Sequence, residues 1–352
     1  MIHLLITFSS PPSLFGEGGW GDGVIRQAGG MGCFPENHTF AGKINGFMIR
    51  YIFSALVGLL TLSQGYLDAQ DFGRMELNKG WKFRRAGTKD WMPAKVPGTV
   101  HLDLMRNNMI PDPYMRDNES KLQWIGQVGW EYTKSFNMEE DEFAWRHLDL
   151  VAEGLDTYAN VFLNDSLVMV TNNMFRTWYA DIKQLLRIGP NTLRIQFPSV
   201  EQQNKLEYDK LPYRLPGDEK VVCRKAAYHY GWDWGPKLVT SGIWRPIYIR
   251  KWNAVNVLGV QFIQEKLTDT LATLSAQFTM FAELADSAEI RLFLDTALVM
   301  REPIVLEKGP NQVRGKFLIK KPQRWWPNGM GQPNLYNFGW EVWFNGKKAG
   351  EG

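Results

Sequence analysis

The chain has 352 residues and a formal net charge of +3, with acidic and basic residues interspersed along it. This length allows two or three domains and a sizeable buried core. Because no stripe of clustered lysine and arginine occurs, the composition argues against a nucleic-acid partner. The two cysteines and five histidines lack metal-site spacing, and no nucleotide-binding glycine motif is present, so we expect no metal and no cofactor.

The N-terminal part of the chain lacks the pattern of a folded domain. Residues 1–47 are rich in glycine and weakly patterned, which predicts a non-native or disordered leader. Residues 48–69 start at Met48, carry Arg50 ahead of a short apolar run and continue in small and polar residues, as secretory signal peptides do. A transmembrane helix needs about 20 apolar residues, more than this run has. We therefore expect a secreted or periplasmic protein that is not attached to a membrane once the signal peptide has been cleaved. The alternative for the apolar run is that it forms a buried core helix.

From about Trp81 onward, apolar and polar residues alternate with the period of two that is typical of β-strands. The segments NTLRIQF (191–197) and AEIRLFLD (288–295) show this clearly. Turn residues at Asn164-Asp165 and Asn345-Gly346 predict hairpins. Many short strands separated by glycine, proline and asparagine predict an all-β protein built from β-sandwiches.

The strand pattern divides into two regions. We place a boundary near Trp252, with one large sandwich over residues 70–252 and a smaller sandwich over 253–352. Few segments look helical, and a short helix is expected in each of residues 98–109 and 200–211.

Residues 227–238, AYHYGWDWGPKL, hold five aromatic or imidazole rings within seven positions. Gly231 and Gly235 interrupt any helix, and Pro236 cannot donate a hydrogen bond in a central strand. The segment is therefore expected to be a shaped loop. Composition alone leaves open whether this loop fills a core or presents a binding surface.

Six segments of the chain occur in a recognisable order: VPGTVHLDLMRNNMIPDPY, ESKLQWIGQVGWEYTKSF, GLDTYANVFLNDSL, NMFRTW, YHYGWDWGPKLVTSGIWRPIYI and RWWPNGMGQPNLY. Together they resemble the N-terminal half of β-mannosidases of glycoside hydrolase family two. The resemblance runs from about Gly73 to the C-terminus. Within the family, GWDWGP is similar to the mannosidase branch rather than to β-galactosidases or β-glucuronidases.

The resemblance implies a jelly-roll, galactose-binding-like sandwich followed by an immunoglobulin-like sandwich and then a (β/α)8 barrel. The family hydrolyses terminal, non-reducing β-D-mannose residues with retention, through two glutamates in the barrel. The chain ends at Gly352, so the barrel and the last strand of the second sandwich are expected to be missing. Retaining hydrolysis needs two carboxyl groups about 5–5.5 Å apart. No such pair is recognisable, and no catalytic residue is assigned.

The loop acquires a specific hypothesis from the resemblance. A mannose ring presents a face of C–H groups and several hydroxyls, so its site needs a flat aromatic ring and a carboxylate. By analogy with the family, Trp232 packs on the sugar ring, Asp233 binds its hydroxyls, and Trp234 either contacts the sugar or anchors the loop. The alternative is that both tryptophans fill a core while Asp233 caps a turn.

The predicted function is therefore that of the non-catalytic N-terminal portion of an exported β-mannosidase, inactive alone. Its expected partners are a β-mannoside glycan and the barrel of the full-length enzyme. A free-standing carbohydrate-binding module, or a scaffold for a separately encoded barrel, is the alternative.

Overall fold

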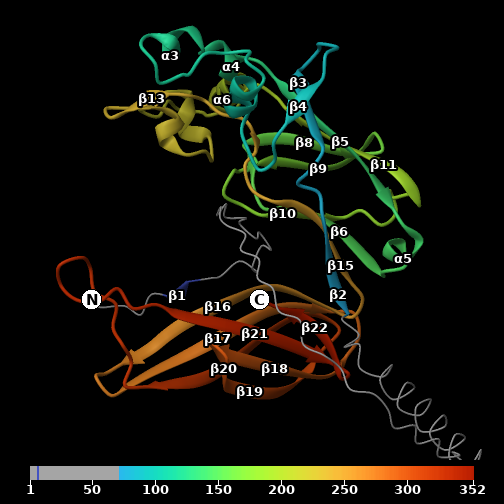
Figure 1. The fold of residues 1–352 in the computed structure, drawn as a ribbon, viewed down its shortest axis with the longest axis vertical. Coiled ribbons are helices and arrows are strands. Elements are labelled where there is room, and N and C mark those ends of the chain that lie inside the picture. The colour runs from blue at the N-terminus through green and yellow to red at the C-terminus, as the bar shows by residue number, and fades with distance from the viewer. Residues whose placement is uncertain (1–5, 8–70) are drawn as a thin grey trace, which may run out of the picture.

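The computed structural model describes residues 6–7 and 71–352 (Figure 1). The expected leader and signal peptide therefore lie outside the described residues, apart from Ile6–Thr7 (β1), which pairs in parallel with Tyr336–Phe344 (β21). Among the described residues, 51% lie in strands and 13% in helices, so the expected all-β class is confirmed.

Two packed sheets form the upper body in Figure 1. The four-stranded sheet has the order β10 (Trp178–Asp181), β6 (His147–Ala152), β15 (Ile247–Trp252) and β2 (Phe72–Glu76). The six-stranded sheet has the order β4 (Met92–Ala94), β3 (Trp81–Arg85), β5 (Trp130–Met138), β11 (Gly189–Phe197), β8 (Tyr158–Leu163) and β9 (Ser166–Asn172). Alternate residues of both sheets, such as Leu150 and Ile195, meet in one buried apolar cluster.

The lower body is a second pair of sheets with its own apolar core. One sheet contains β16 (Val255–Leu267), β17 (Leu271–Ala282) and β20 (Gly309–Lys320). The other contains β19 (Ala297–Leu306), β18 (Asp286–Leu294), β21 and β22 (Lys347–Glu351). In the structure, β22 pairs antiparallel with β21. That the second sandwich lacks its last strand stays a prediction.

Both predicted hairpin turns are present. Asn164 and Asp165 have φ values of 47° and 66°, and Asn345 and Gly346 have values of 49° and 72°. Positive φ at both central residues is the geometry of a type I′ turn, which matches the right-handed twist of the strands that it joins. The sequence therefore defines the turns between β8 and β9 and between β21 and β22.

The two predicted helices are also present, as α2 (Val100–Arg106) and α6 (Val200–Asp209). Ser199 caps α6, because its hydroxyl accepts a hydrogen bond from the backbone N–H of Gln202 at 3.2 Å. None of the described helices is long and apolar enough to cross a membrane. The other helical turns within residues 71–352 are α3 (Asn118–Lys121), α4 (Trp124–Gln127), α5 (Glu140–Phe143), η1 (Glu219–Val222) and η2 (Ala227–His229).

Polar and aromatic contacts join the two bodies. The Asp71 carboxylate accepts hydrogen bonds from the Asn253 side chain at 2.8 Å and from the Ala254 backbone N–H at 3.1 Å. The His147 Nε2 atom lies 3.1 Å from the Glu283 carboxylate. These contacts fix the short segment between β15 and β16, where the chain passes from the first body to the second.

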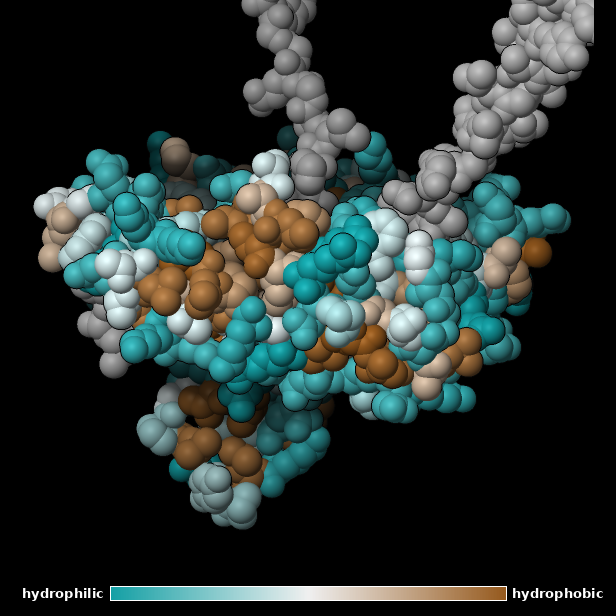
Figure 2. Space-filling view, turned by 90° about the horizontal axis from the view of Figure 1, so that it is seen from below, coloured by the Kyte–Doolittle hydropathy of each residue, from teal (hydrophilic) through white to brown (hydrophobic). Residues whose placement is uncertain are grey.

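The outer surface of the lower body is mixed in character. Seen from below, it shows apolar patches broken up by hydrophilic side chains (Figure 2). Exposed apolar side chains of this body include Leu298 and Val305 of β19 and Leu318 of β20. Single exposed apolar residues are ordinary on soluble proteins, so they do not by themselves mark a site.

Candidate functional site

The predicted loop is a two-stranded hairpin that stands apart from both large sheets. It consists of β12 (Tyr230–Trp232) and β13 (Gly235–Lys237), with Trp232 paired to Gly235. Asp233 and Trp234 are therefore the two turn residues. Gly231 has a φ of +89°, a conformation that L-residues rarely adopt, so glycine is required there.

The three predicted site residues lie together at the tip of this hairpin. The Trp232 and Trp234 residues are 54% and 73% exposed, and their rings meet edge to face with centroids 5.2 Å apart. Asp233 is exposed, and its carboxylate makes no hydrogen bond within the described residues. The tip is thus a surface feature, and neither tryptophan fills the core.

The β13 leg is held against the loops above the sandwich. Its last residue, Lys237, donates its backbone N–H to the Glu119 carboxylate at 2.7 Å and accepts a hydrogen bond at its carbonyl from Gln123 at 2.9 Å. Its ammonium group lies 2.8 Å from the Glu201 carboxylate. Side chains from α3, the loop that follows it, and α6 therefore fix this leg.

The β12 leg is held by helix α6. The buried Asn204 donates a hydrogen bond to the Tyr230 hydroxyl at 2.7 Å and accepts one from the Tyr158 hydroxyl at 3.2 Å. Burial raises the pKa of both tyrosines, so both phenols stay protonated. A hollow of about 420 Å³ lies beside this leg, lined by Glu201, Asn204, Lys205, Asp218, Glu219, Lys220, Tyr230 and Lys237.

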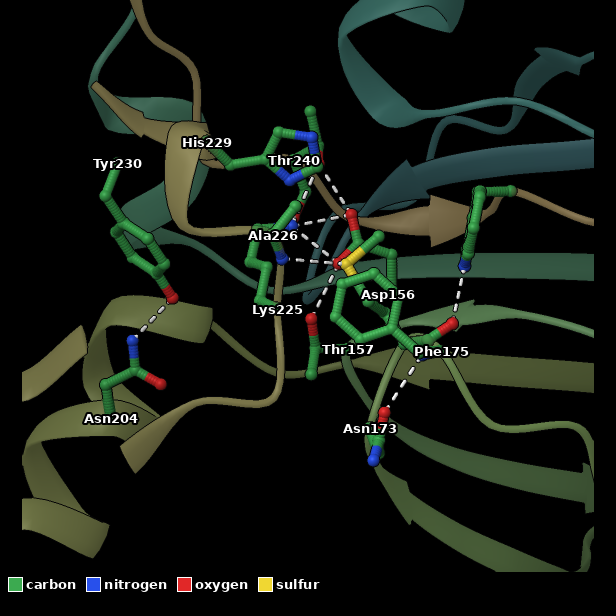
Figure 3. A network of polar contacts seen from close by, with 12 residues as sticks. Asp156, Thr157, Asn173, Phe175, Asn204, Lys225, Ala226, His229, Tyr230 and Thr240 are labelled. Carbon is green, nitrogen blue, oxygen red and sulfur yellow. Dashed lines mark hydrogen bonds and ion pairs between the residues drawn. The ribbon is translucent and has the colours of Figure 1, made fainter. Parts of the chain in front are cut away.

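A buried ion pair joins Lys225, which precedes the hairpin in the chain, to Asp156 (Figure 3). The Lys225 ammonium donates to both carboxylate oxygens of Asp156, at 2.5 and 2.6 Å, and to the Thr240 carbonyl at 2.9 Å. The Thr240 hydroxyl donates to Asp156 at 2.5 Å, and the Thr157 hydroxyl does so at 2.6 Å. The Lys225 and Asp156 side chains are 0% and 1% exposed.

Two neutral histidines border this ion pair. Burial and the positive charge of Lys225 lower the pKa of His101 to about 4, and the same causes lower that of His229 to about 4. The His229 Nδ1 atom lies 3.3 Å from the Thr240 hydroxyl. Because that hydroxyl already donates its hydrogen to Asp156, the His229 Nδ1 must be the donor. Both imidazoles therefore avoid placing a second positive charge beside Lys225.

The sequence alone predicts the hairpin tip but not these supporting residues. Asp156 is on the short strand β7 (Leu155–Asp156), which pairs with β14 (Gly242–Ile243), and it lies 69 positions from Lys225. No short motif connects two residues so far apart. In the part of the chain that the structure describes, no group of three or more histidine, cysteine or acidic side chains could hold a metal ion.

Comparison with known proteins gives a family match for the first body. The family described as "Glycosyl hydrolase 2 galactose-binding domain-like" matches residues 81–245, which include both legs of the hairpin. The first body is a glycosyl hydrolase 2 galactose-binding-like domain. The expected resemblance to β-mannosidases of glycoside hydrolase family two is thereby confirmed.

The chain is also similar to curated β-mannosidases. The chain is 32% identical over 270 residues to β-mannosidase B of Thermothelomyces thermophilus, and 34% identical over 277 residues to β-mannosidase B of Aspergillus fumigatus. Each match covers 74% of this chain but only 31% and 32% of the relative. The chain therefore spans about a third of the length of the curated relatives that it matches.

The chain is also similar in structure to solved glycoside-cleaving enzymes. The β-D-mannosidase from Dictyoglomus thermophilum matches with a TM-score of 0.72 and 32% identity, over 79% of this chain and 35% of that one. The exo-chitosanase CsxA of Amycolatopsis orientalis matches with a TM-score of 0.61 but 18% identity, over 80% of this chain and 33% of that one. The second likeness shows a shared fold alone.

Proposed function

We propose that the chain is the non-catalytic N-terminal portion of an exported β-mannosidase and supplies sugar-contacting residues to a barrel domain. The observation that carries the proposal is the hairpin tip, where two exposed indoles flank a carboxylate that makes no hydrogen bond with the residues that the structure describes. The names of the relatives and the share of them that the chain matches support it. The two carboxylates of retaining hydrolysis then belong to the part of the enzyme beyond the matched third.

The chemistry of the tip suits a terminal mannose. An indole covers the C–H face of a sugar ring, and a carboxylate accepts hydrogen bonds from two neighbouring hydroxyls. In this proposal Trp232 packs on the ring, Asp233 binds hydroxyls, and Trp234 supports Trp232 through their edge-to-face contact. A carbohydrate is therefore the proposed partner, and the barrel completes its pocket.

A fusion protein tests the proposal. The whole chain is joined to the part of the Dictyoglomus thermophilum β-D-mannosidase that it does not match. We expect the fusion to hydrolyse an aryl β-mannoside and the chain alone to show no turnover above background. Asp233→Ala should lower kcat/KM of the fusion about 10- to 1000-fold, because it removes one or two hydrogen bonds to a charged group, each contributing about 1.5–3 kcal/mol.

Asp90 gives the matched control, since it is an exposed aspartate outside the hairpin. Asp90→Ala should leave kcat/KM of the fusion unchanged. If the chain alone hydrolyses the mannoside, and an acidic residue within it is needed, the non-catalytic assignment is wrong. If the chain alone binds β-mannosides as tightly as the fusion does, the alternative of a free-standing carbohydrate-binding module replaces it.

A further inference from the structure

One buried carboxylate joins both ends of the hairpin to the sandwich. Lys225 precedes β12 by five positions and Thr240 follows β13 by three, and both bind Asp156. Asp156 belongs to β7, in the body of the galactose-binding-like domain. Lys225 before the hairpin and Thr240 after it thus bind the same carboxylate, as Figure 3 shows.

The ion pair is saturated with hydrogen bonds. The Asp156 carboxylate receives hydrogens from Lys225, Thr157 and Thr240. Lys225 also binds the Thr240 carbonyl and hydroxyl, each at 2.9 Å. Removing two charges from water is costly, and well-packed apolar side chains of similar volume are often as stable in such a place. The ion pair is therefore not explained by its contribution to stability alone. Its hydrogen bonds, in contrast, have a fixed direction and so fix the two legs of the hairpin relative to each other.

Neighbouring contacts reinforce the same attachment. The Ala226 backbone N–H donates to the Met174 sulfur at 3.2 Å, and the Met174 backbone N–H donates to the Arg224 carbonyl at 3.0 Å. The residues on either side of Lys225 are thus tied to the segment after β9. Burial lowers the pKa of Lys225, and the neighbouring Asp156 opposes this effect.

We propose that Lys225 and Asp156 are positioning residues, which hold the tip formed by Trp232, Asp233 and Trp234 in one orientation. The consequence for sugar turnover rests on the proposed function, whereas the ordering of the hairpin does not. Neither residue touches the sugar in this proposal. They act through the two legs, whose backbone they fix at Lys225 and Thr240.

Hydrogen–deuterium exchange of the full chain tests the positioning. The readout is the peptide that covers residues 227–238, compared with peptides from β5 and β11. The variants are Lys225→Met, which leaves a buried charge unpaired, and the double variant Lys225→Met/Asp156→Leu, which removes both charges. We expect the double variant to melt close to the wild type and its sandwich peptides to keep their protection, while the hairpin peptide exchanges about tenfold faster or more.

The melting temperature and the hairpin exchange of the double variant together show whether the ion pair orients the hairpin or only stabilises the domain. If the ion pair only stabilises the domain, the double variant recovers both its melting temperature and its hairpin protection, and the proposal fails. Thr240→Val is the milder variant, because it removes the hydroxyl contacts with Asp156, Lys225 and His229 but keeps the ion pair itself. Should the double variant not fold, an exchange rate of the Thr240→Val hairpin equal to that of the wild type would overturn the proposal, and a rise of a few fold would support it.

A second ion pair provides the matched control. Arg250 and Asp149 bind each other at 2.8 Å in the four-stranded sheet, away from the hairpin. Arg250→Met/Asp149→Leu should leave exchange of the hairpin peptide unchanged. Faster hairpin exchange in this control would show that any lost ion pair loosens the loop, and the specific role of Lys225 and Asp156 would be refuted.

The fusion enzyme separates this inference from the proposed function. Lys225→Met/Asp156→Leu should lower kcat/KM at least tenfold, because it weakens the same sugar contacts that Asp233→Ala removes. The further decrease in kcat/KM caused by adding Asp233→Ala should therefore be smaller in this double variant than in the wild type. If Asp233→Ala alone has no effect, the proposed function fails while the exchange result still decides the positioning. If exchange rises but turnover of the double variant is normal, the link between hairpin order and turnover is wrong.

Discussion

The His147 imidazole stacks on the Trp252 indole, with ring centroids 3.7 Å apart and planes 10° apart. The same indole meets Phe281 of the second body edge to face at 6.2 Å and donates its N–H to Asp149 at 2.9 Å. Trp252 is 6% exposed. One side chain thus contributes to the packing of both sandwiches at the place where the chain passes between them.

Trp252→Ala should therefore weaken both bodies and their connection. Truncating a buried tryptophan costs about 3–5 kcal/mol. We expect a large fall in the free energy of unfolding in denaturant titration, together with separate calorimetric transitions for the two sandwiches. Trp234→Ala is the control, since its exposed ring should contribute less than about 0.5 kcal/mol to stability. Equal losses in the two variants would contradict this assignment.

Stability should depend on pH through His101. Its pKa is about 4 in the folded protein and 6.5 when unperturbed, because burial and Lys225 disfavour its charged form. Above pH 6.5 both states are neutral and the contribution to stability is complete. As the pH falls from 6.5 toward 4, the unfolded chain takes up a proton that the folded chain does not. The free energy of unfolding then falls by at most about 1.4 kcal/mol per pH unit.

Replacing His101 should flatten this dependence. We expect the loss of unfolding free energy between pH 7 and pH 5 to be smaller in His101→Leu and in His101→Asn than in the wild type. Part of the slope should persist, because His229 has a pKa of about 4 for similar reasons and Asp156 and Lys225 lie beside both rings. An unchanged slope in both variants would show that His101 takes up its proton equally in both states.

Export is a further expectation from the sequence. Residues 48–65 should direct secretion, so that the mature protein begins between Tyr66 and Asp71. N-terminal sequencing of the product from the native host, with the cytoplasmic fraction as control, measures this. A cytoplasmic product that still carries Met48 would refute it.

Local chemistry explains which parts of the fold could be predicted. The hairpin turns at Asn164-Asp165 and Asn345-Gly346 follow from residues that tolerate positive φ. The strands around them follow from period-two alternation, as in β11 and β18. These signals act within a few residues, so they are visible in a single sequence. The limits of the two expected domains stay a prediction.

The candidate site was predictable only at its tip. The rings and the carboxylate of GWDWGP are adjacent in the sequence, whereas their exposure depends on the support of the legs. Asp156 gives no sequence signal of its role, because Lys225 reaches it only after the sandwich has formed. In the same way, Glu119 meets Lys237 across 118 positions. Long-range contacts of this kind, rather than local pattern, distinguish a presented hairpin from a packed loop.

The central claim is that Asp233 binds a hydroxyl of the terminal mannose. A double-mutant cycle on the fusion enzyme tests it, with Asp233→Ala as one change and removal of a single hydroxyl from an aryl β-mannoside, at each position in turn, as the other. For the hydroxyl that Asp233 binds, kcat/KM should fall strongly in either single change and little further in the double change, with a coupling energy of about 1.5 kcal/mol or more. If the free-energy effects of Asp233→Ala and of hydroxyl removal add to within about 0.5 kcal/mol for every hydroxyl, Asp233 does not bind the sugar in this way.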